Sequence, residues 1–250
     1  MLYQLVKAMT AGALRVFFRL RVVGAEHVPR EGAALLAANH VSLLDPPVVG
    51  AAAPRPLHFM AKAELFRLPL LGTLIRRLNA HPVEREGADA GALRHALLLL
   101  REGQALLVFP EGTRGTEGRL QPGRPGAGML AALSEAPVVP VYVQGTGHAL
   151  PRGAGRPRRA SITVRYGPAL RFARARGKHR YQEISDQIMA AIGRLKAEAE
   201  RASPPVVEPA SPESVGARSP RGESDPLAGR PTGANAERTA RGPWPAGQIH

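Results

Sequence analysis

Residues 21–201 alternate between short apolar runs that are typical of buried strands and longer runs with helical spacing. The strand-like runs are Ala33–Ala38, Pro56–Met60, Ala105–Phe109, Val138–Val143 and Ser161–Arg165. The helical runs cover residues 70–78, 88–101, 126–134 and 181–201. Strands that alternate with helices along a chain favour an α/β fold, in which helices cover a sheet. The sequence therefore predicts an α/β domain over residues 21–201.

The segments on either side of this domain differ from it in composition. Residues 202–250 hold nine prolines and six glycines but few large apolar side chains. So little apolar surface cannot offset the entropy of ordering the chain, and we therefore expect a disordered, Pro/Gly/Ala-rich tail. No apolar run reaches the roughly 18–20 residues that a membrane-spanning helix needs.

Residues 1–20 predict an amphipathic helix. At 100° per residue, one side gathers the apolar side chains Leu2, Leu5, Val6, Met9, Ala13, Val16, Phe17 and Leu20. The opposite side carries Gln4, Lys7, Arg15 and Arg19. An apolar face opposite a cationic face suits a helix that lies in the membrane interface. A helix packed on the domain's own core would show the same pattern, and amphipathicity alone does not separate the two interpretations.

The charge and the absence of cysteine limit the possible functions. The chain has no cysteine, which excludes disulfides, zinc–thiolate sites and a cysteine nucleophile. The net charge of +14 lies within residues 1–201. This surplus points to phosphate-rich partners, namely nucleic acid, an anionic membrane or a phosphorylated substrate. Ten of the cations fall in an acid-free stretch between Glu135 and Glu183, which fits contact with anionic lipid, an acidic donor molecule or simply a solvated basic loop.

His40 and Asp45 form the first candidate site. An apolar strand runs directly into Asn39-His40, and Pro46 suits the first turn of a helix. Polar groups at the carboxyl end of a buried strand lie where α/β sheets bind their ligands. Asp45 could therefore hold one ring nitrogen of His40 and leave the other to act as a general base. The structural alternative is that Asp45 caps the helix beside an ordinary surface histidine.

The second candidate site is Phe109-Pro-Glu-Gly-Thr-Arg-Gly115, which follows a strongly apolar strand. Glycine allows backbone N–H groups to approach an anion, and Arg114 offers a bidentate fork that suits phosphate. The alternative is a structural ion pair between Glu111 and Arg114. Arg85, at the end of a short strand that contains His81, is a candidate second phosphate ligand. The remaining histidines show no ligand-like spacing, so we expect no metal site.

Four blocks together, in order, resemble the glycerolipid acyltransferases of the 1-acylglycerol-3-phosphate acyltransferase group. The first block is Asn-His-Val-Ser-Leu-Leu-Asp-Pro at 39–46. The second is Ala-Lys-Ala-Glu-Leu-Phe-Arg-Leu-Pro-Leu-Leu-Gly at 61–72, followed by Pro-Val-Glu-Arg at 82–85. The third is Phe-Pro-Glu-Gly-Thr-Arg-Gly at 109–115, and the fourth is Ala-Pro-Val-Val-Pro-Val-Tyr-Val at 136–143. The resemblance covers about residues 20–170.

The resemblance implies a fold and a set of roles. It implies a mixed, largely parallel sheet flanked by helices, as in glycerol-3-phosphate acyltransferase. His40 would be the catalytic base and Asp45 its orienting partner, while Pro140 would help to shape the acyl pocket. The site for the acceptor's phosphate would consist of Arg85, Glu111, Gly112, Thr113 and Arg114. Two departures stand out. Asn79 replaces a usual glycine, and Pro122-Gly-Arg-Pro-Gly126 stands where an aromatic residue and a lysine are common, with Arg124 as the candidate replacement for the lysine.

The implied reaction moves a fatty acyl group from acyl-CoA or acyl-acyl-carrier-protein to the free hydroxyl of a lyso-glycerophospholipid. The leading candidate acceptor is 1-acyl-sn-glycerol-3-phosphate, which would become phosphatidic acid. We expect no metal or redox cofactor, an anionic membrane surface as partner, and a peripheral or monotopic position on the cytoplasmic face. The alternatives are acylation of another lyso-lipid and a non-catalytic lipid-binding protein. A nucleic-acid-binding role ranks below these because no recognised binding motif is present.

Overall fold

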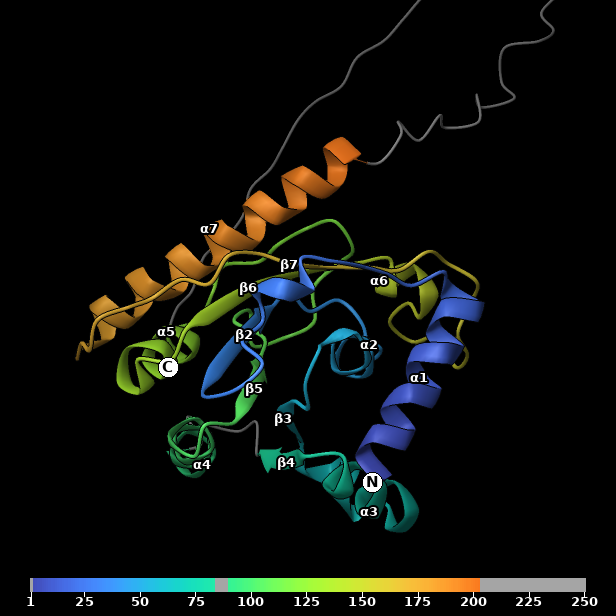
Figure 1. Ribbon diagram of the computed structural model, residues 1–250, viewed down its shortest axis with the longest axis horizontal. Helices are drawn as coiled ribbons and strands as arrows, with labels where there is room; N and C mark the ends of the chain where they lie inside the picture. Colours follow the sequence, from blue (N-terminus) through green and yellow to red (C-terminus); the bar gives the residue numbers. More distant parts are fainter. Residues whose placement is uncertain (1, 84–89, 203–250) are drawn as a thin grey trace, which may run out of the picture. The chain divides into compact units, whose positions relative to one another are not determined.

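The computed structural model describes residues 2–83 and 90–202, all of which belong to one compact unit. A seven-stranded sheet forms its centre, with the strands in the order β1-β7-β6-β2-β5-β3-β4 (Figure 1). The strands are β1 (Arg21–Val23), β2 (Ala34–Ala38), β3 (His58–Lys62), β4 (Ala80–Val83), β5 (Ala105–Val108), β6 (Val138–Gln144) and β7 (Thr163–Tyr166). All neighbouring strands pair in parallel except β6 and β7. The predicted mixed, largely parallel α/β sheet is therefore confirmed.

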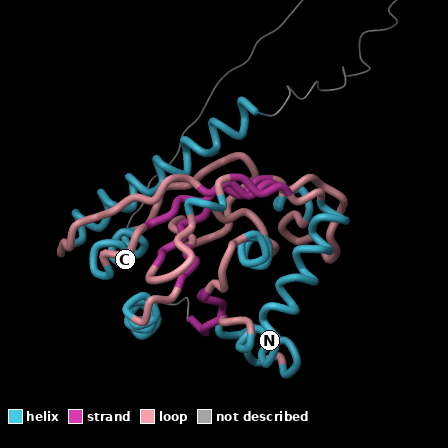
Figure 2. Tube along the Cα trace, in the orientation of Figure 1, coloured by secondary structure: helices cyan, strands magenta, loops and turns pink. Residues whose placement is uncertain are grey.

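Helices cover both faces of this sheet (Figure 2). The α-helices are α1 (Leu2–Phe18), α2 (Asp45–Ala52), α3 (Pro69–Arg77), α4 (Ala90–Arg101), α5 (Pro125–Ser134), α6 (Thr146–Ala149) and α7 (Lys178–Ala202). Two short 3-10 helices are η1 (Ala25–His27) and η2 (Ala63–Arg67). Each predicted helix and strand of residues 21–201 is present, with ends displaced by a few residues.

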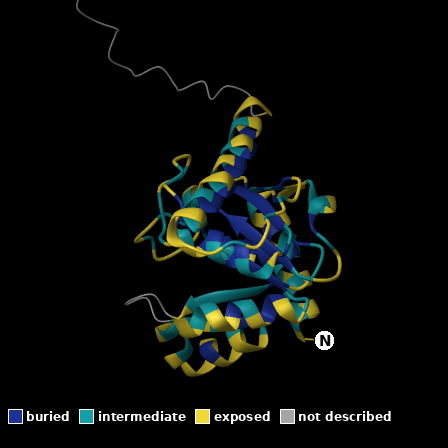
Figure 3. Ribbon diagram, turned by 90° about the vertical axis from the view of Figure 1, so that its left-hand side faces the viewer, coloured by how far each residue is buried: buried dark blue, intermediate teal, exposed yellow. Residues whose placement is uncertain are grey.

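Side-chain alternation along the central strand β2 divides the core into two layers. Leu36 and Ala38 pack with α1, α2 and α6 on one face of the sheet. Leu35 and Ala37 pack with α4, α5 and α7 on the other face. Because β2 is buried on both faces, its sequence is an unbroken apolar run with no polar alternation. Figure 3 shows the buried strands between helices whose outer sides are exposed.

Helix α1 leaves most of its predicted apolar face on the surface. Leu14 packs into the core, but Leu5, Met9, Val16 and Phe17 are exposed, with 76% of Val16 accessible to solvent. On its other side the helix is fixed to the domain by polar contacts: Lys7 Nζ donates to the Ala53 carbonyl at 2.5 Å, and the Tyr3 hydroxyl accepts from the Leu57 N–H at 3.0 Å. The helix therefore packs on the domain through part of its surface and presents an apolar stripe outward.

The ten cations of the acid-free stretch lie in four parts of the structure, namely the α6–β7 loop, β7, the segment before α7 and the first turn of α7. Strand β1 was not predicted, since a three-residue edge strand with exposed side chains has no burial pattern to reveal it. The proposed tail lies outside the described residues except for its first residue, Ala202, which ends α7.

Candidate active site

The end of β2 and the start of α2 bring His40 and Asp45 together. The strand stops at Ala38, residues 39–44 turn back, and α2 begins at Asp45 with Pro46 and Pro47 in its first turn. His40 Nδ1 lies 2.8 Å from Asp45 Oδ2. The Asp45 side chain has no exposed surface, and His40 is 8% exposed. A carboxylate on Nδ1 fixes the ring orientation and leaves Nε2 as the nitrogen available to a substrate.

Asp45 uses its carboxylate to hold the loop and not to cap the helix. Its Oδ2 accepts the backbone N–H groups of Val41 at 2.7 Å and Ser42 at 2.8 Å, in addition to the His40 ring. Its Oδ1 accepts the Thr146 hydroxyl at 2.5 Å. Among the described residues, no side chain caps α2 with a hydrogen bond. The capping interpretation of Asp45 therefore does not describe this structure.

The same loop is clamped to β6 and the segment that follows it. The Asn39 side chain donates to the Val143 carbonyl at 2.9 Å and accepts the Val143 N–H at 2.7 Å, which extends the β2–β6 pairing by one residue. The Ser42 hydroxyl donates to the Leu150 carbonyl at 2.9 Å. These contacts fix the backbone on both sides of His40 and therefore hold the candidate base in place.

The turn after β5 supports His40 from the opposite side. Glu111 Oε1 accepts the His40 backbone N–H at 2.9 Å, and Oε2 accepts the Gln121 N–H at 3.1 Å. The Gly115 N–H donates to the His40 carbonyl at 2.7 Å. The Phe109 ring stacks on the imidazole with 4.0 Å between ring centroids. Burial raises the pKa of the Glu111 carboxyl, while the two backbone N–H groups oppose that rise.

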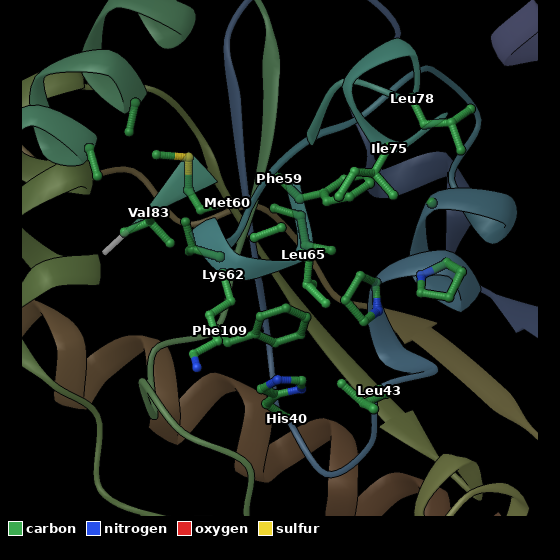
Figure 4. A pocket seen from close by; sticks show the side chains of 18 of the residues that line it. His40, Leu43, Phe59, Met60, Lys62, Leu65, Ile75, Leu78, Val83 and Phe109 are labelled. Atoms are coloured by element: carbon green, nitrogen blue, oxygen red, sulfur yellow. The ribbon is translucent and has the colours of Figure 1, made fainter. Parts of the chain in front are cut away.

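His40 opens into a cavity of about 820 Å³ at the carboxyl ends of β2, β5, β3 and β4. This is the edge of the sheet at which parallel α/β folds bind their ligands. Most of the wall is apolar, and α1, α2 and α3 contribute to it together with α4 and α5. Figure 4 shows His40 beside Phe109 and Leu43, with Phe59, Leu65 and Ile75 further along the cavity. A long apolar chain is the kind of ligand that such a wall accepts.

Cationic side chains lie at the His40 end of this cavity. Arg114 and Arg124 both line it, together with Gly112. The Arg124 side chain crosses Gly112 so closely that a Cβ atom on the glycine would lie 2.7 Å from Arg124 Cδ, and Gly112 has a φ of 68°. Glycine is therefore required here by both space and backbone conformation. Among the described residues, neither guanidinium has a hydrogen-bond or ion-pair partner.

The structure places the sequence candidates in different positions. His40, Gly112 and Arg114 line the cavity, and Asp45 lies directly behind His40. Glu111 and Thr113 are not among the described residues that line it. Glu111 is 2% exposed and orders two loops, and no ion pair of the described segments joins it to Arg114. Pro140 is buried within β6, away from the cavity, and Arg85 lies outside the described residues.

Sequence reasoning missed Thr146 and the structural role of Phe109. Thr146 is 101 residues from Asp45 along the chain, so no local pattern reveals the contact. The available signal was the position of Thr146 just after the buried strand β6. Asn39 and His40 follow the buried strand β2 in the same way. Arg124 was noted only as a replacement for a lysine.

The described residues hold neither a metal centre nor a membrane span. No group of three or more His, Cys, Asp or Glu side chains among them is placed to hold a metal ion. None of the helices in the described part is both long and apolar enough to cross a membrane.

A histidine–carboxylate pair that opens into an apolar cavity with cationic side chains is the kind of site that suits an enzyme acting on lipid-like molecules with an anionic group. Comparisons with known proteins identify the family. The Acyltransferase family model matches residues 19–144. The chain belongs to this acyltransferase family.

Named relatives agree with this assignment. The 1-acyl-sn-glycerol-3-phosphate acyltransferase of Bacillus subtilis (strain 168) is 34% identical over 140 residues, which are 54% of this chain and 69% of the relative. The enzyme of that name from Limnanthes douglasii is 34% identical over 154 residues, or 60% of this chain and 54% of the relative. The 1-acyl-sn-glycerophosphate (LPA) acyltransferase PlsC from Thermotoga maritima matches with a TM-score of 0.69 at 25% identity, over 81% of each chain.

Proposed function

We propose that this protein transfers a fatty acyl group from an acyl thioester to the free hydroxyl of 1-acyl-sn-glycerol-3-phosphate, which gives phosphatidic acid. The observation that carries the proposal is the buried His40–Asp45 pair at the cationic end of an apolar cavity. The relatives named for this reaction support the choice of acceptor. Acyl-CoA and acyl-acyl-carrier-protein are the candidate donors, and the reaction uses no metal or redox cofactor.

The geometry supports a direct transfer. His40 Nε2 takes the proton from the acceptor hydroxyl while the hydroxyl oxygen attacks the thioester carbonyl. Asp45 holds the ring through Nδ1 and stabilises the imidazolium that forms. The tetrahedral intermediate then collapses, the carbon–sulfur bond breaks, and the leaving thiolate takes the proton from His40. Because the chain has no cysteine, an acyl-cysteine intermediate is excluded.

Arg114 and Arg124 are the proposed ligands of the acceptor's phosphate. Both residues line the same cavity as His40. A phosphate bound by these two forks would hold the glycerol hydroxyl close to Nε2, and such positioning lowers the barrier by several kcal/mol. Arg85 stays a candidate third ligand.

We also propose that the protein works at a membrane surface, on the cytoplasmic face, where acyl thioesters of CoA and carrier protein are formed. The exposed apolar side chains of α1 and α3 support this, because both helices also line the cavity. In α3, Leu70 is 90% exposed, and Arg76 and Arg77 follow in the last turn of the helix. Apolar side chains next to basic ones suit an anionic lipid surface.

Kinetics with two acceptors test the proposal. The full chain is assayed with lysophosphatidic acid and with monoacylglycerol, which lacks the phosphate, for the wild type and for Arg114→Ala. We expect the wild type to prefer the phosphorylated acceptor strongly, because a charge-assisted hydrogen bond is worth about 1.5–3 kcal/mol. Arg114→Ala should lose most of that preference through a raised KM, with little change in the KM of the thioester donor.

Other lyso-phospholipids serve as the competing acceptors. Faster transfer to a different lyso-lipid would reassign the substrate. If the wild type and Arg114→Ala lose the same factor in kcat/KM when the acceptor lacks its phosphate, Arg114 does not belong to the phosphate site. Absence of transfer to every acceptor would favour a lipid-binding role.

A further inference from the structure

Thr146 is the first residue of α6, and its side chain reaches the candidate catalytic pair. It is fully buried, and its hydroxyl donates to Asp45 Oδ1 at 2.5 Å. The other three donors to this carboxylate, namely the His40 ring and the N–H groups of Val41 and Ser42, all reach Oδ2. Within the described part of the chain, Thr146 is therefore the partner on which Oδ1 depends.

The segment that carries Thr146 is held at both ends. Glu117 Oε1 accepts the Gly145 N–H at 2.9 Å, and Glu117 Oε2 accepts the Gly147 N–H at 2.7 Å. A Cβ atom on Gly147 would lie 2.6 Å from that Oε2 atom, so only glycine allows the carboxylate to come so close. At the other end, the Leu150 carbonyl accepts the Ser42 hydroxyl. Both the Thr146 backbone and the loop that it contacts are thus fixed in place.

We propose that Thr146 is a positioning residue that fixes Asp45 and sets how strongly Asp45 attracts the proton on His40, with Glu117 holding Thr146 in place. The inference rests on the proposed function, in which His40 is the base. A hydroxyl that donates a hydrogen bond to a carboxylate oxygen stabilises the negative charge of the carboxylate. Without it, Oδ1 becomes a buried acceptor with no partner in the described structure, and the charge on Asp45 favours the imidazolium form of His40.

Other charged groups around the pair stay the same when Thr146 is changed. Glu111 contacts the His40 backbone from the β5 side and Glu117 holds α6. The cavity into which the ring opens is lined by the cations Lys7, Lys62, Arg114 and Arg124. A change in the protonation of His40 in a Thr146 variant therefore reports on the Asp45 contact itself.

The experiment compares Thr146→Val, which keeps the shape and removes the hydroxyl, with Thr146→Ser, which restores it. The control is Tyr166→Phe, which removes another buried hydroxyl, one that donates to the Val49 carbonyl at 3.3 Å. For Thr146→Val we expect the acid limb of kcat/KM to move up by about half to one pH unit, so that activity below the midpoint falls about three- to tenfold. The KM of the acceptor should stay unchanged, and Thr146→Ser and Tyr166→Phe should keep the wild-type limb.

NMR titration of isotope-labelled histidine rings gives a readout that needs no substrate. The His40 signal is assigned by its loss in His40→Ala, and its titration midpoint should move up in Thr146→Val by the same amount as the acid limb. A wild type without activity on any lyso-lipid would refute the proposed function, and the NMR midpoint would still decide the role of Thr146. If the wild type is active, and Thr146→Val has the same acid limb and the same NMR midpoint as the wild type, the inference about Thr146 alone is overturned.

A second variant covers the case in which Thr146→Val does not fold. Glu117→Gln leaves the hydroxyl in place but can accept only one of the two glycine N–H groups through its amide oxygen. We expect a shift in the same direction but smaller. An unchanged midpoint in a folded Glu117→Gln, with Thr146→Ser also matching the wild type, would overturn the proposal.

Discussion

Acidification should destabilise this protein through a cluster of three histidines, His58, His81 and His95, which joins β3, β4 and α4. His81 Nε2 lies 2.9 Å from His58 Nδ1, and His81 Nδ1 lies 2.8 Å from His95 Nε2. Burial and then the charges of His95 and His58 lower the pKa of His81 to about 4. Burial also lowers the pKa of His58, near which Glu102 and Arg55 act in opposite directions.

The sign and size of the effect follow from these values. In the unfolded chain a histidine has a pKa of about 6.5, so between about pH 6.5 and 4 the unfolded state binds more protons than the folded state. The free energy of unfolding therefore falls as the pH falls through this window. From pH 7 to pH 5 the shift of His81 corresponds to about 1.8 kcal/mol, which solvent screening of this half-exposed group reduces to about 1 kcal/mol. In a domain of this size, about 1 kcal/mol lowers Tm by about 2–4 °C.

Thermal unfolding at pH 7 and pH 5 tests this in three proteins: the wild type, His81→Asn and His179→Asn. His179 is the matched control because its side chain is 91% exposed and belongs to a surface ion pair with Glu183. Carboxylates titrate in all three proteins. The difference between the wild type and His81→Asn in the loss of unfolding free energy from pH 7 to pH 5 therefore reports on the histidine cluster. We expect His81→Asn to lose about 1 kcal/mol less than the wild type on acidification, and His179→Asn to match the wild type. The reasoning is refuted if His81→Asn loses as much stability as the wild type.

Three further predictions concern the site and its surroundings. His40→Ala should lower acyl transfer by about 10²–10⁴-fold, and Asp45→Asn should also be slow because it disturbs the tautomer of the His40 ring. Steady-state assays measure the activity of both variants, and circular dichroism checks that they fold. Activity of His40→Ala near that of the wild type would exclude His40 as the base. Met9→Glu with Val16→Glu should weaken co-sedimentation with anionic vesicles, whereas Met9→Gln with Val16→Gln should weaken it less; unchanged binding in both would assign the contact to another surface. Removal of residues 203–250 should leave Tm within about 2 °C and activity intact, because the last buried side chain of α7 is that of Ala199; a large loss of either would show that the segment supports the fold.

The arrangement of the sheet could be predicted from the sequence because the central strands are buried on both faces. β2 and β5 are apolar over their whole length and β6 is apolar up to Val143, so each shows in the sequence as a continuous apolar run. β1 has three exposed residues and depends on backbone pairing with β7, which leaves no mark in the sequence. The departure at Asn79 has a physical reason: its φ is 62°, a conformation that favours glycine and that asparagine adopts more readily than most residues.

The relation between His40 and Asp45 shows where local sequence reasoning stops. An aspartate before Pro46 serves equally well as a helix cap or as the partner of a histidine, because both roles use the carboxylate as an acceptor. The backbone of residues 41–42 decides between them, since it turns its N–H groups toward Asp45 Oδ2 and draws the side chain away from α2. Thr146 binds the Asp45 carboxylate and Val143 binds the Asn39 side chain, and both lie about a hundred residues away from their partners.

The third block illustrates how one short motif divides its work. Glu111 and Gly115 bind the backbone of His40, and Phe109 stacks on its ring, so these three residues support the candidate base. Arg114 alone among the charged residues of the block lines the cavity. Glu111 accepts two backbone N–H groups, and no ion pair among the described residues joins its carboxylate to Arg114. The acid of the block therefore holds the backbone around His40, whereas its arginine lines the cavity in which we propose the phosphate site.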